Sequence, residues 1–398
     1  MTEKLYYQTP VLNECDATVL VCEPQDTGWR VLLDKTVIFP EGGGQPADKG
    51  FIGEAVVRDA QEINGEIWHE CDMPLDVGAE YKVRFMQGIR RDHTEQHTGE
   101  HILSGVAYSL FGAKNVGFHM AEEYCTIDFD IFLNEDELTV LEREANLIVR
   151  LDLPVRAEIV GASELEGLIL RKKSDVKADE VRIIYIDEGR VDSCTCCGTH
   201  FESTGKVGAI KITDSQKYKG GSRLWFNCGG RAVNAAADMQ RTVTELARGF
   251  STSREELAAA IRKQSEELGA AKKELKEKAR LIAKLTAEAK GHDGAVVLNE
   301  PELNSADIKM LAEALTARFN CAALVFGGGA GVTYYTLAKS KSVACHMGEV
   351  CKAVNAAMAG KGGGGADFAS GSSQRPVTPE LVSMLENYIN GLMKGAGK

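Results

Sequence analysis

Two short segments, far apart in the chain, are dense in side chains that bind metal ions. HTGEH places His97 and His101 four positions apart on a predicted helix, with His93 one turn earlier, and CTCCGTH supplies Cys196 and His200. Residues four apart in a helix lie on one face, so both imidazoles can reach one ion. Two nitrogens from the helix with one sulfur and one nitrogen from the second segment make a four-coordinate zinc site. Such a site requires the two segments to meet in the folded chain.

The cysteine-rich segment also has to be weighed as a redox centre and as a self-contained zinc knuckle. A redox pair fits poorly, because Cys194, Cys196 and Cys197 lack the usual helix-opening Cys-x-x-Cys context. A knuckle would need a second ligand pair nearby, and none lies between residues 130 and 227. HTGEH is not the zinc peptidase motif either, since that motif has glutamate directly after the first histidine. The mixed nitrogen and sulfur donors favour zinc over other divalent ions.

Composition sets the broad class of the protein. The chain has 398 residues, of which 44% are hydrophobic and 26% charged, as in an ordinary globular protein of two or three domains. It has no apolar run long enough for a membrane span and no signal peptide at its start, so we expect a cytoplasmic protein with reduced cysteines. The net charge of −12 argues against indiscriminate nucleic-acid binding and leaves room for a local basic path.

The first half of the chain predicts two parts. Residues 1–90 carry short runs of branched and aromatic residues between turns, which indicates a small β-barrel or sandwich. The three glycines of EGGGQPADKG interrupt this pattern with a backbone that can lie close to a ligand. Residues 91–231 alternate helical and strand patterns, with a helix that stops at Gly112 and a strand over 181–187 that leads into the cysteine cluster.

The second half predicts a long helical segment and a last α/β unit. The helical segment has heptads typical of packing against a partner helix, and it breaks near GFSTS, where Ser253 and Glu256 form a capping box. The alternative is a helix that lies on its own domain. The last unit has strand-like runs at 294–300, 321–328 and 342–348, followed by a glycine-rich loop, AGKGGGGADFASGS.

Three of these motifs, in their order, resemble a known domain. FPEGGGQPADKG, then HTGEH, then CCGTH resembles the editing domain of alanyl-tRNA synthetase, which also occurs in the freestanding alanyl-tRNA editing proteins of the AlaX family. GKGGGGADFASGS resembles the glycine-rich loop of the DHH-associated domain that ends the synthetase and the longer AlaX proteins. The chain has no room for an aminoacylation domain and no Asp-His-His triplet. It therefore looks like a trans-editing protein of the long AlaX form.

The resemblance implies an α+β editing domain preceded by a small β-barrel-like domain, then a long coiled-coil-like helical segment and a C-terminal α/β DHH-associated domain. The expected boundaries are 1–90, 91–231, 232–290 and 291–398. The helical segment holds 12 Lys and Arg against 9 Asp and Glu over residues 238–290, so it is mildly basic. It would grip the tRNA or, with the C-terminal domain, pair two subunits as a homodimer.

The resemblance also implies roles for single residues. One zinc ion per chain falls to the four family ligands, which match His97, His101, Cys196 and His200. Cys197 stands where the family commonly has glycine and receives no metal role, and Glu100 stands where relatives carry unlike residues, which argues against a required general base. The substrate contacts implied are Gly43, Gly44, Gln45 (also a catalytic candidate), His119 and Thr199. The tRNA contacts implied are Lys217, Lys219, Arg223, Lys361, Gly363 and Gly364.

The implied activity is hydrolysis of the ester that joins a wrong amino acid to tRNA specific for alanine. The expected wrong amino acids are serine and, in second place, glycine, because an aminoacylation site that accepts alanine cannot firmly reject either one. Two other functions fit the same motifs: a non-catalytic, zinc-stabilised tRNA-binding protein, and a zinc hydrolase of a small ester or amide.

Overall fold

The computed structural model describes residues 1–7, 13–173, 180–329 and 331–395. The chain divides into two compact units, Met1–Leu246 and Ala247–Lys398. None of the helices in the described ranges is long and apolar enough to cross a membrane. The finer division into four domains stays a prediction.

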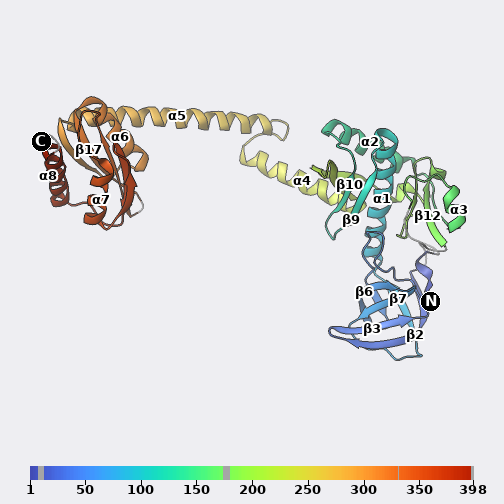
Figure 1. Cartoon of the computed structure of the whole chain (residues 1–398). Helices are drawn as coiled ribbons and strands as arrows, with labels where there is room; N and C mark the ends of the chain where they lie inside the picture. The colour runs from blue at the N-terminus through green and yellow to red at the C-terminus, as the bar shows by residue number, and fades with distance from the viewer. Residues whose placement is uncertain (8–12, 174–179, 330, 396–398) are drawn as a thin grey trace. The chain divides into compact units, whose positions relative to one another are not determined.

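A closed six-stranded barrel forms the start of the first unit, which confirms the predicted barrel (Figure 1). Around the barrel the strands follow the order β2-β3-β7-β6-β5-β8. Alternate residues of these strands point inward and fill the barrel with Val31, Leu33, Val57 and Ile67, all fully buried. The strands are β2 (Glu14–Gln25), β3 (Gly28–Leu33), β5 (Gly50–Ile52), β6 (Ala55–Ile63), β7 (Glu66–Cys71) and β8 (Glu80–Phe85), with β1 (Glu3–Lys4) and β4 (Lys35–Thr36) paired beside them.

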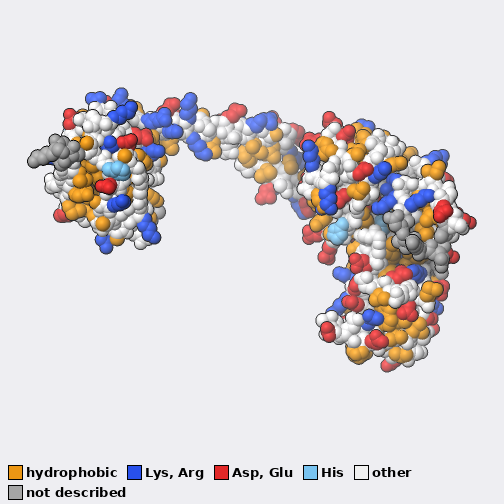
Figure 2. Space-filling view, viewed as in Figure 1, with side chains coloured by type: hydrophobic (Ala, Val, Ile, Leu, Met, Phe, Trp, Pro, Cys, Tyr) orange, Lys and Arg blue, Asp and Glu red, His pale blue; other side chains and the backbone are white. Residues whose placement is uncertain are grey.

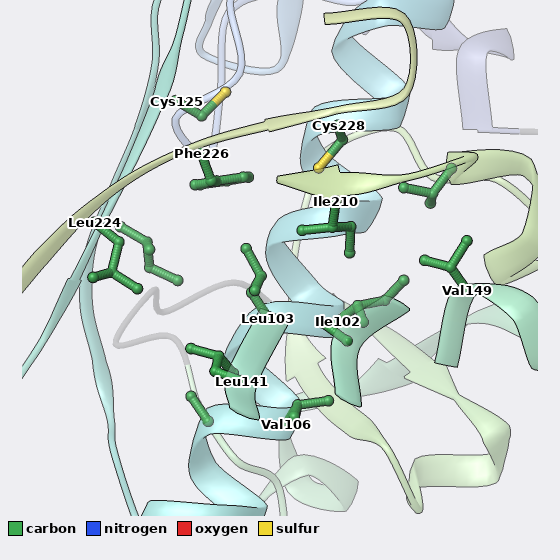
Figure 3. Packing of buried hydrophobic residues seen from close by; sticks show 14 of the residues in the cluster. Ile102, Leu103, Val106, Cys125, Leu141, Val149, Ile210, Leu224, Phe226 and Cys228 are labelled. Atoms are coloured by element: carbon green, nitrogen blue, oxygen red, sulfur yellow. The ribbon is translucent and has the colours of Figure 1, made fainter. Parts of the chain in front are cut away.

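Helix α1 (Gln87–Phe111) is the central element of the rest of this unit. Its apolar face, with Ile102, Leu103 and Val106, packs against α2 (Glu135–Leu151) and against strand residues such as Phe226 (Figure 3). The helix ends at Gly112, as predicted, because that glycine takes the left-handed conformation (φ 69°) that caps a helix. Helix α2 begins with a capping box in which Asn134 and Glu137 satisfy each other's backbone amides.

Two sheets lie on either side of α1 (Figure 1). The four-stranded sheet has the order β14-β15-β10-β9 and the three-stranded sheet the order β11-β12-β13. The cysteine cluster follows β13, a short strand that the sequence did not predict, rather than the strand over 181–187, because the chain turns back at Asp187–Gly189 and pairs with itself. The bounds are β9 (Asn115–Met120), β10 (Cys125–Phe129), β11 (Val155–Gly161), α3 (Ala162–Gly167), β12 (Glu180–Ile186), β13 (Asp192–Thr195), β14 (Ile210–Tyr218) and β15 (Gly221–Cys228).

The long helical segment consists of α4 (Gly229–Gly249) and α5 (Leu257–Lys290), so the predicted break is confirmed. The predicted capping box at the start of α5 is wrong: the Ser253 hydroxyl accepts from the Glu256 amide in a preceding turn, and Glu256, the N-cap, makes no side-chain cap. Helix α5 is about 51 Å long. Its buried residues are Leu257 at the start and Ala283 and Ala287 in the last turns, which pack against α6. Figure 2 shows basic, acidic and hydrophobic side chains interspersed along the rest of the helix.

The second unit is built on a five-stranded sheet in the order β16-β17-β18-β20-β19, in which β16 and β17 are parallel. The predicted strand at 342–348 is wrong: Val343 and Cys345 are buried in a loop, and the buried Met347 is already the first residue of α7. The glycine-rich segment is a hairpin rather than a loop. The elements are β16 (Gly294–Glu300), α6 (Ser305–Arg318), β17 (Cys321–Gly329), β18 (Val332–Lys339), α7 (Met347–Met358), β19 (Lys361–Gly364), β20 (Phe368–Ser373) and α8 (Pro379–Gly395).

Candidate metal centre

Helix α1 and the loop after β13 bring four ligand-type side chains together. The nitrogen and sulfur atoms of His97, His101, Cys196 and His200 all lie within 4.8 Å of one another. The Cys196 sulfur is 3.4 Å from Nε2 of His97 and 3.4 Å from Nε2 of His200. The two helix histidines are almost fully buried. Three imidazole nitrogens and one thiolate are a donor set that suits zinc, so these residues can hold a metal ion.

Each imidazole is held from behind by a different partner. His97 donates Nδ1–H to Gln45 Oε1 (2.9 Å), and His101 Nδ1 contacts Asp192 Oδ2 (2.8 Å). The third ring is held more loosely, with His200 Nδ1 3.4 Å from the Thr98 hydroxyl. A partner on Nδ1 fixes the ring and leaves Nε2 free to bind a metal. The three Nε2 atoms are thus oriented toward the shared centre.

The electrostatics prepare these groups for a cation. Burial opposes ionisation of the Cys196 thiol, but His97 and His200 outweigh it and hold its pKa well below the ordinary range. Burial, helped by nearby His101, lowers the pKa of His200 to about 3, so this ring is neutral at pH 7. Burial also disfavours the Asp192 carboxylate, yet His101 and Arg171 keep its pKa below the usual value. A thiolate and a neutral imidazole are the forms that bind metal.

The GGGQ turn reaches the centre through its glutamine. Gln45 is fully buried, and its Oε1 accepts from both His97 and the Thr199 amide (3.0 Å), while its Nε2 donates to the Thr199 hydroxyl (3.0 Å). Gly198 completes this packing, because a Cβ there would lie 2.1 Å from the His97 ring. The glutamine therefore ties the barrel turn, the helix and the cysteine loop into one structure.

Arg182 of β12 fixes the backbone of the cysteine loop. Its Nη1 donates to the carbonyls of Cys196 (3.0 Å) and Gly198 (2.8 Å), and its guanidinium lies over the ring of Tyr7. The Tyr7 hydroxyl in turn donates to the Cys197 carbonyl (2.8 Å). These bonds hold the loop in the conformation that aims Cys196 and His200 at one point.

A cavity of about 520 Å³ opens beside the centre. Its wall includes His97, His101 and Cys196 of the metal cluster and Gly43 of the glycine-rich turn. Further lining residues are Glu100, Asn115, Phe118, Arg171, Lys172, Glu180, Val181, Arg182, Cys194, Thr195 and Cys197. A space of this size accommodates an amino-acid ester with part of the nucleotide that carries it.

Other residues singled out in the sequence lie elsewhere. His119 is exposed, and its neighbour Phe118 faces the cavity instead, as the alternation of a strand requires. Thr199 is buried behind the metal centre, bonded to Gln45. His93 is buried away from the cluster, and its Nδ1 has no partner among the residues described here.

The other two cysteines of the cluster differ from Cys196. Cys197 is exposed and is not among the grouped ligand atoms. Cys194 is buried, and its thiol, His101 and Asp192 form a second close group. Burial raises the pKa of the Cys194 thiol to about 11, so this thiol is neutral at pH 7 and a poor metal ligand. Arg171 already pairs with Asp192, and its positive charge would repel a second cation bound there.

The predicted tRNA contacts fall on two hairpins, one in each unit. Lys217 and Lys219 are exposed at the β14–β15 turn, where their ammonium groups lie over the rings of Phe132 and Tyr218. Arg223 is engaged by Asp128 through two hydrogen bonds of 2.6 and 2.7 Å. In the second unit, Lys361, Gly363 and Gly364 are exposed on β19. The two lysines and the β19 hairpin are therefore accessible, whereas the Arg223 charge is neutralised by its neighbour.

Comparisons with known proteins find relatives over most of the chain. The family model "Threonyl and Alanyl tRNA synthetase second additional domain" matches residues 181–224. Alanyl-tRNA editing protein AlaX-L of Pyrococcus horikoshii is 31% identical over 388 residues, covering 93% of this chain and 94% of its own length. Alanyl-tRNA editing protein Aarsd1-A of Xenopus laevis is 33% identical over 301 residues, 71% of each chain.

Solved structures match as well. The C-Ala domain of Aquifex aeolicus alanyl-tRNA synthetase covers 25% of this chain and 91% of that domain, at 24% identity. The TM-score is 0.22.

Proposed function

The chain belongs to the family of alanyl-tRNA editing proteins that includes AlaX-L and Aarsd1, and from this membership we propose that it is a trans-editing hydrolase. Its substrate would be tRNA specific for alanine that carries serine or glycine, and the bond broken would be the ester to the 3′ end. The reaction would take place in the cytoplasm. The observation that carries the proposal is the cluster of His97, His101, Cys196 and His200 beside a cavity of about 520 Å³.

The four clustered residues would hold one zinc ion. When bound, zinc would supply a Lewis acid for the ester carbonyl and favour ionisation of water at neutral pH. Gln45 and Asp192 would keep the His97 and His101 rings in the orientation that binding requires. Gly43 and Phe118 would form part of the wall against which the ester lies.

The rest of the chain would bind the tRNA. Lys217 and Lys219, exposed at the end of β14, would contact the acceptor end, with the paired Arg223 in a supporting role. Lys361, Gly363 and Gly364 would present backbone and charge to the phosphates from the second unit. Helix α5 would contact the tRNA body or a second subunit through its exposed face. His119 and Thr199 were also predicted as substrate contacts. Neither lines the cavity, so their effect on the substrate would be indirect.

The proposal is tested by incubating the protein with tRNA(Ala) charged separately with serine, glycine and alanine. We expect the protein to release serine and glycine, which would bind in the same pocket, and to leave alanine on the tRNA. Equal release of all three would contradict an editing function. No release, with zinc bound, would favour a non-catalytic tRNA-binding protein. Activity confined to small esters would favour the other hydrolase.

A further inference from the structure

A buried carboxylate lies beside the metal centre without belonging to it. Glu100 lies on α1 one position before His101, is 4% exposed and lines the same cavity as His97 and Cys196. It is absent from both clusters of ligand atoms found in the described part of the chain. Burying a charge is costly unless something compensates it. Glu100 therefore needs a role that the metal cluster does not give it.

The orientation of this carboxylate is fixed through one of its oxygens. Oε1 accepts from the Ser104 hydroxyl (2.5 Å) and from Nδ2 of Asn115 (2.5 Å). Asn115 is itself fixed, because its Nδ2 also contacts Ser104 and its Oδ1 accepts from the Gly117 amide. The other oxygen, Oε2, lies 3.8 Å from Nε2 of His101 and makes no hydrogen bond with a described residue.

Three cations line the cavity, and two of them have clear partners, whereas Lys172 forms no ion pair with a described residue. Arg171 pairs with Asp192, and Arg182 is bound to loop carbonyls. Within the described ranges no Lys or Arg forms an ion pair with Glu100. Glu180, the other acidic residue of the wall, is exposed at the start of β12. Glu100 is thus a buried carboxylate of the cavity that forms no ion pair with a described Lys or Arg, although Arg171 lies within electrostatic range of it.

We propose that Oε2 of Glu100 binds the α-ammonium group of the aminoacyl ester. This inference rests on the proposed function and names a contact within it. The ammonium nitrogen of an aminoacyl ester lies about 2.5 Å from the carbonyl carbon. A group that binds it must therefore lie next to the metal ligands, where Oε2 is found. A charge-assisted hydrogen bond in a buried site is strong and would orient the ester for attack.

The test compares two substrates with two proteins. The substrates are seryl-tRNA(Ala) and the analogue in which a hydroxyl replaces the α-ammonium group; the proteins are wild type and Glu100→Gln. Glutamine can keep the hydrogen bonds to Ser104 and Asn115 while it removes the charge. We expect wild type to prefer the ammonium substrate in kcat/KM, and Glu100→Gln to lose about 10- to 100-fold of that preference. The intrinsic reactivities of the two esters cancel in this comparison.

Two further variants make the result specific. Glu180→Gln removes the same charge at an exposed position of the wall and should keep the wild-type preference. Glu100→Asp keeps the negative charge on a shorter side chain, so the carboxylate lies farther from the cavity. Its preference for the ammonium substrate should fall between those of wild type and Glu100→Gln. Bound zinc should be unchanged in all variants. Equal slowing of both substrates by Glu100→Gln would overturn the ammonium contact alone. A wild type that hydrolyses neither ester would overturn the proposed function, and this contact with it.

Discussion

At the scale of single residues, the centre depends on groups that do not touch the metal position. Gln45, Asp192 and Thr98 each contact Nδ1 of one histidine and so decide which nitrogen faces the centre. Such partners commonly affect metal affinity by about 10- to 100-fold. The groups that pack around these rings therefore contribute to metal affinity together with the ligands.

Gly198 gives a direct test of this packing. An alanine Cβ would lie 2.1 Å from Cε1 and 2.2 Å from Nδ1 of His97, so the ring or the loop must move. We expect Gly198→Ala to weaken zinc binding on the order of 10- to 100-fold, as measured by competition with a chelator. The matched control is Gly88→Ala on the first turn of α1, where an added Cβ meets nothing within 4 Å. Unchanged zinc affinity in Gly198→Ala would contradict the geometry.

The sequence allows the four ligand-type residues to be recognised, but it does not reveal the residues that hold them in place. His97 and His101 could be recognised because helical spacing is local, and Cys196 with His200 because they are close in sequence. Asp192 reaches His101, and Arg171 reaches Asp192, through the pairing of β13 with β12 and the loop before it. No periodic pattern marks such long-range partners, so they were missed.

At the scale of elements, the barrel contains a buried histidine that makes its stability depend on pH. His69 of β7 is fully buried, with Nδ1 3.2 Å from the Val31 carbonyl and Nε2 2.9 Å from the Thr36 hydroxyl. Burial lowers its pKa to about 4. The unfolded chain has an ordinary histidine, with a pKa of about 6.5. The unfolded state therefore takes up the proton first as pH falls.

We expect the contribution of His69 to be complete above about pH 6.5 and to be lost progressively as pH falls toward 4, by about 3 kcal/mol at most. His69→Gln should be less stable than wild type at pH 7 but lose less stability on acidification, in urea unfolding followed at pH 7 and pH 4.5. The control is His119→Gln, which changes an exposed histidine of the same unit. A pH dependence equal to wild type in His69→Gln would show that another group is responsible.

Element prediction succeeded where the pattern is periodic and failed where it is ambiguous. The barrel strands, α1 and the break between α4 and α5 follow from alternation and helical spacing. The run 342–348 alternates like a strand, but it is a loop followed by the start of α7, and the strand that pairs with β17 is β18. The β19–β20 hairpin is rich in glycine, which usually opposes strands; here a Cβ on Gly362 or Gly364 would clash with the opposite strand.

At the scale of the whole molecule, all groups of the metal centre lie in the unit Met1–Leu246, whereas the glycine-rich hairpin lies in Ala247–Lys398. The first unit has its own two hydrophobic cores, one inside the barrel and one around α1. Metal binding should therefore be independent of the second unit. Binding of tRNA would draw on both.

A fragment that ends after α4, residues 1–249, tests this division. We expect it to bind one zinc ion with wild-type affinity, measured by chelator competition, because it keeps all four ligands and their partners. Its KM for charged tRNA should rise, while kcat is largely kept, since the hairpin at Lys361 is removed. A folded fragment that binds no zinc would show that the second unit completes the centre.

The central claim is that the cluster of α1 and the β13 loop is a zinc-dependent deacylation site. It is tested most directly by measuring serine release from seryl-tRNA(Ala) against bound zinc in metal-stripped and reconstituted protein. Release should be absent without metal and rise to a maximum at one zinc per chain. Cys196→Ala should lose both zinc and activity, whereas Cys197→Ala, with its exposed side chain, should keep both. Full activity in the stripped protein, or the reverse pattern in the two cysteine variants, would contradict the claim.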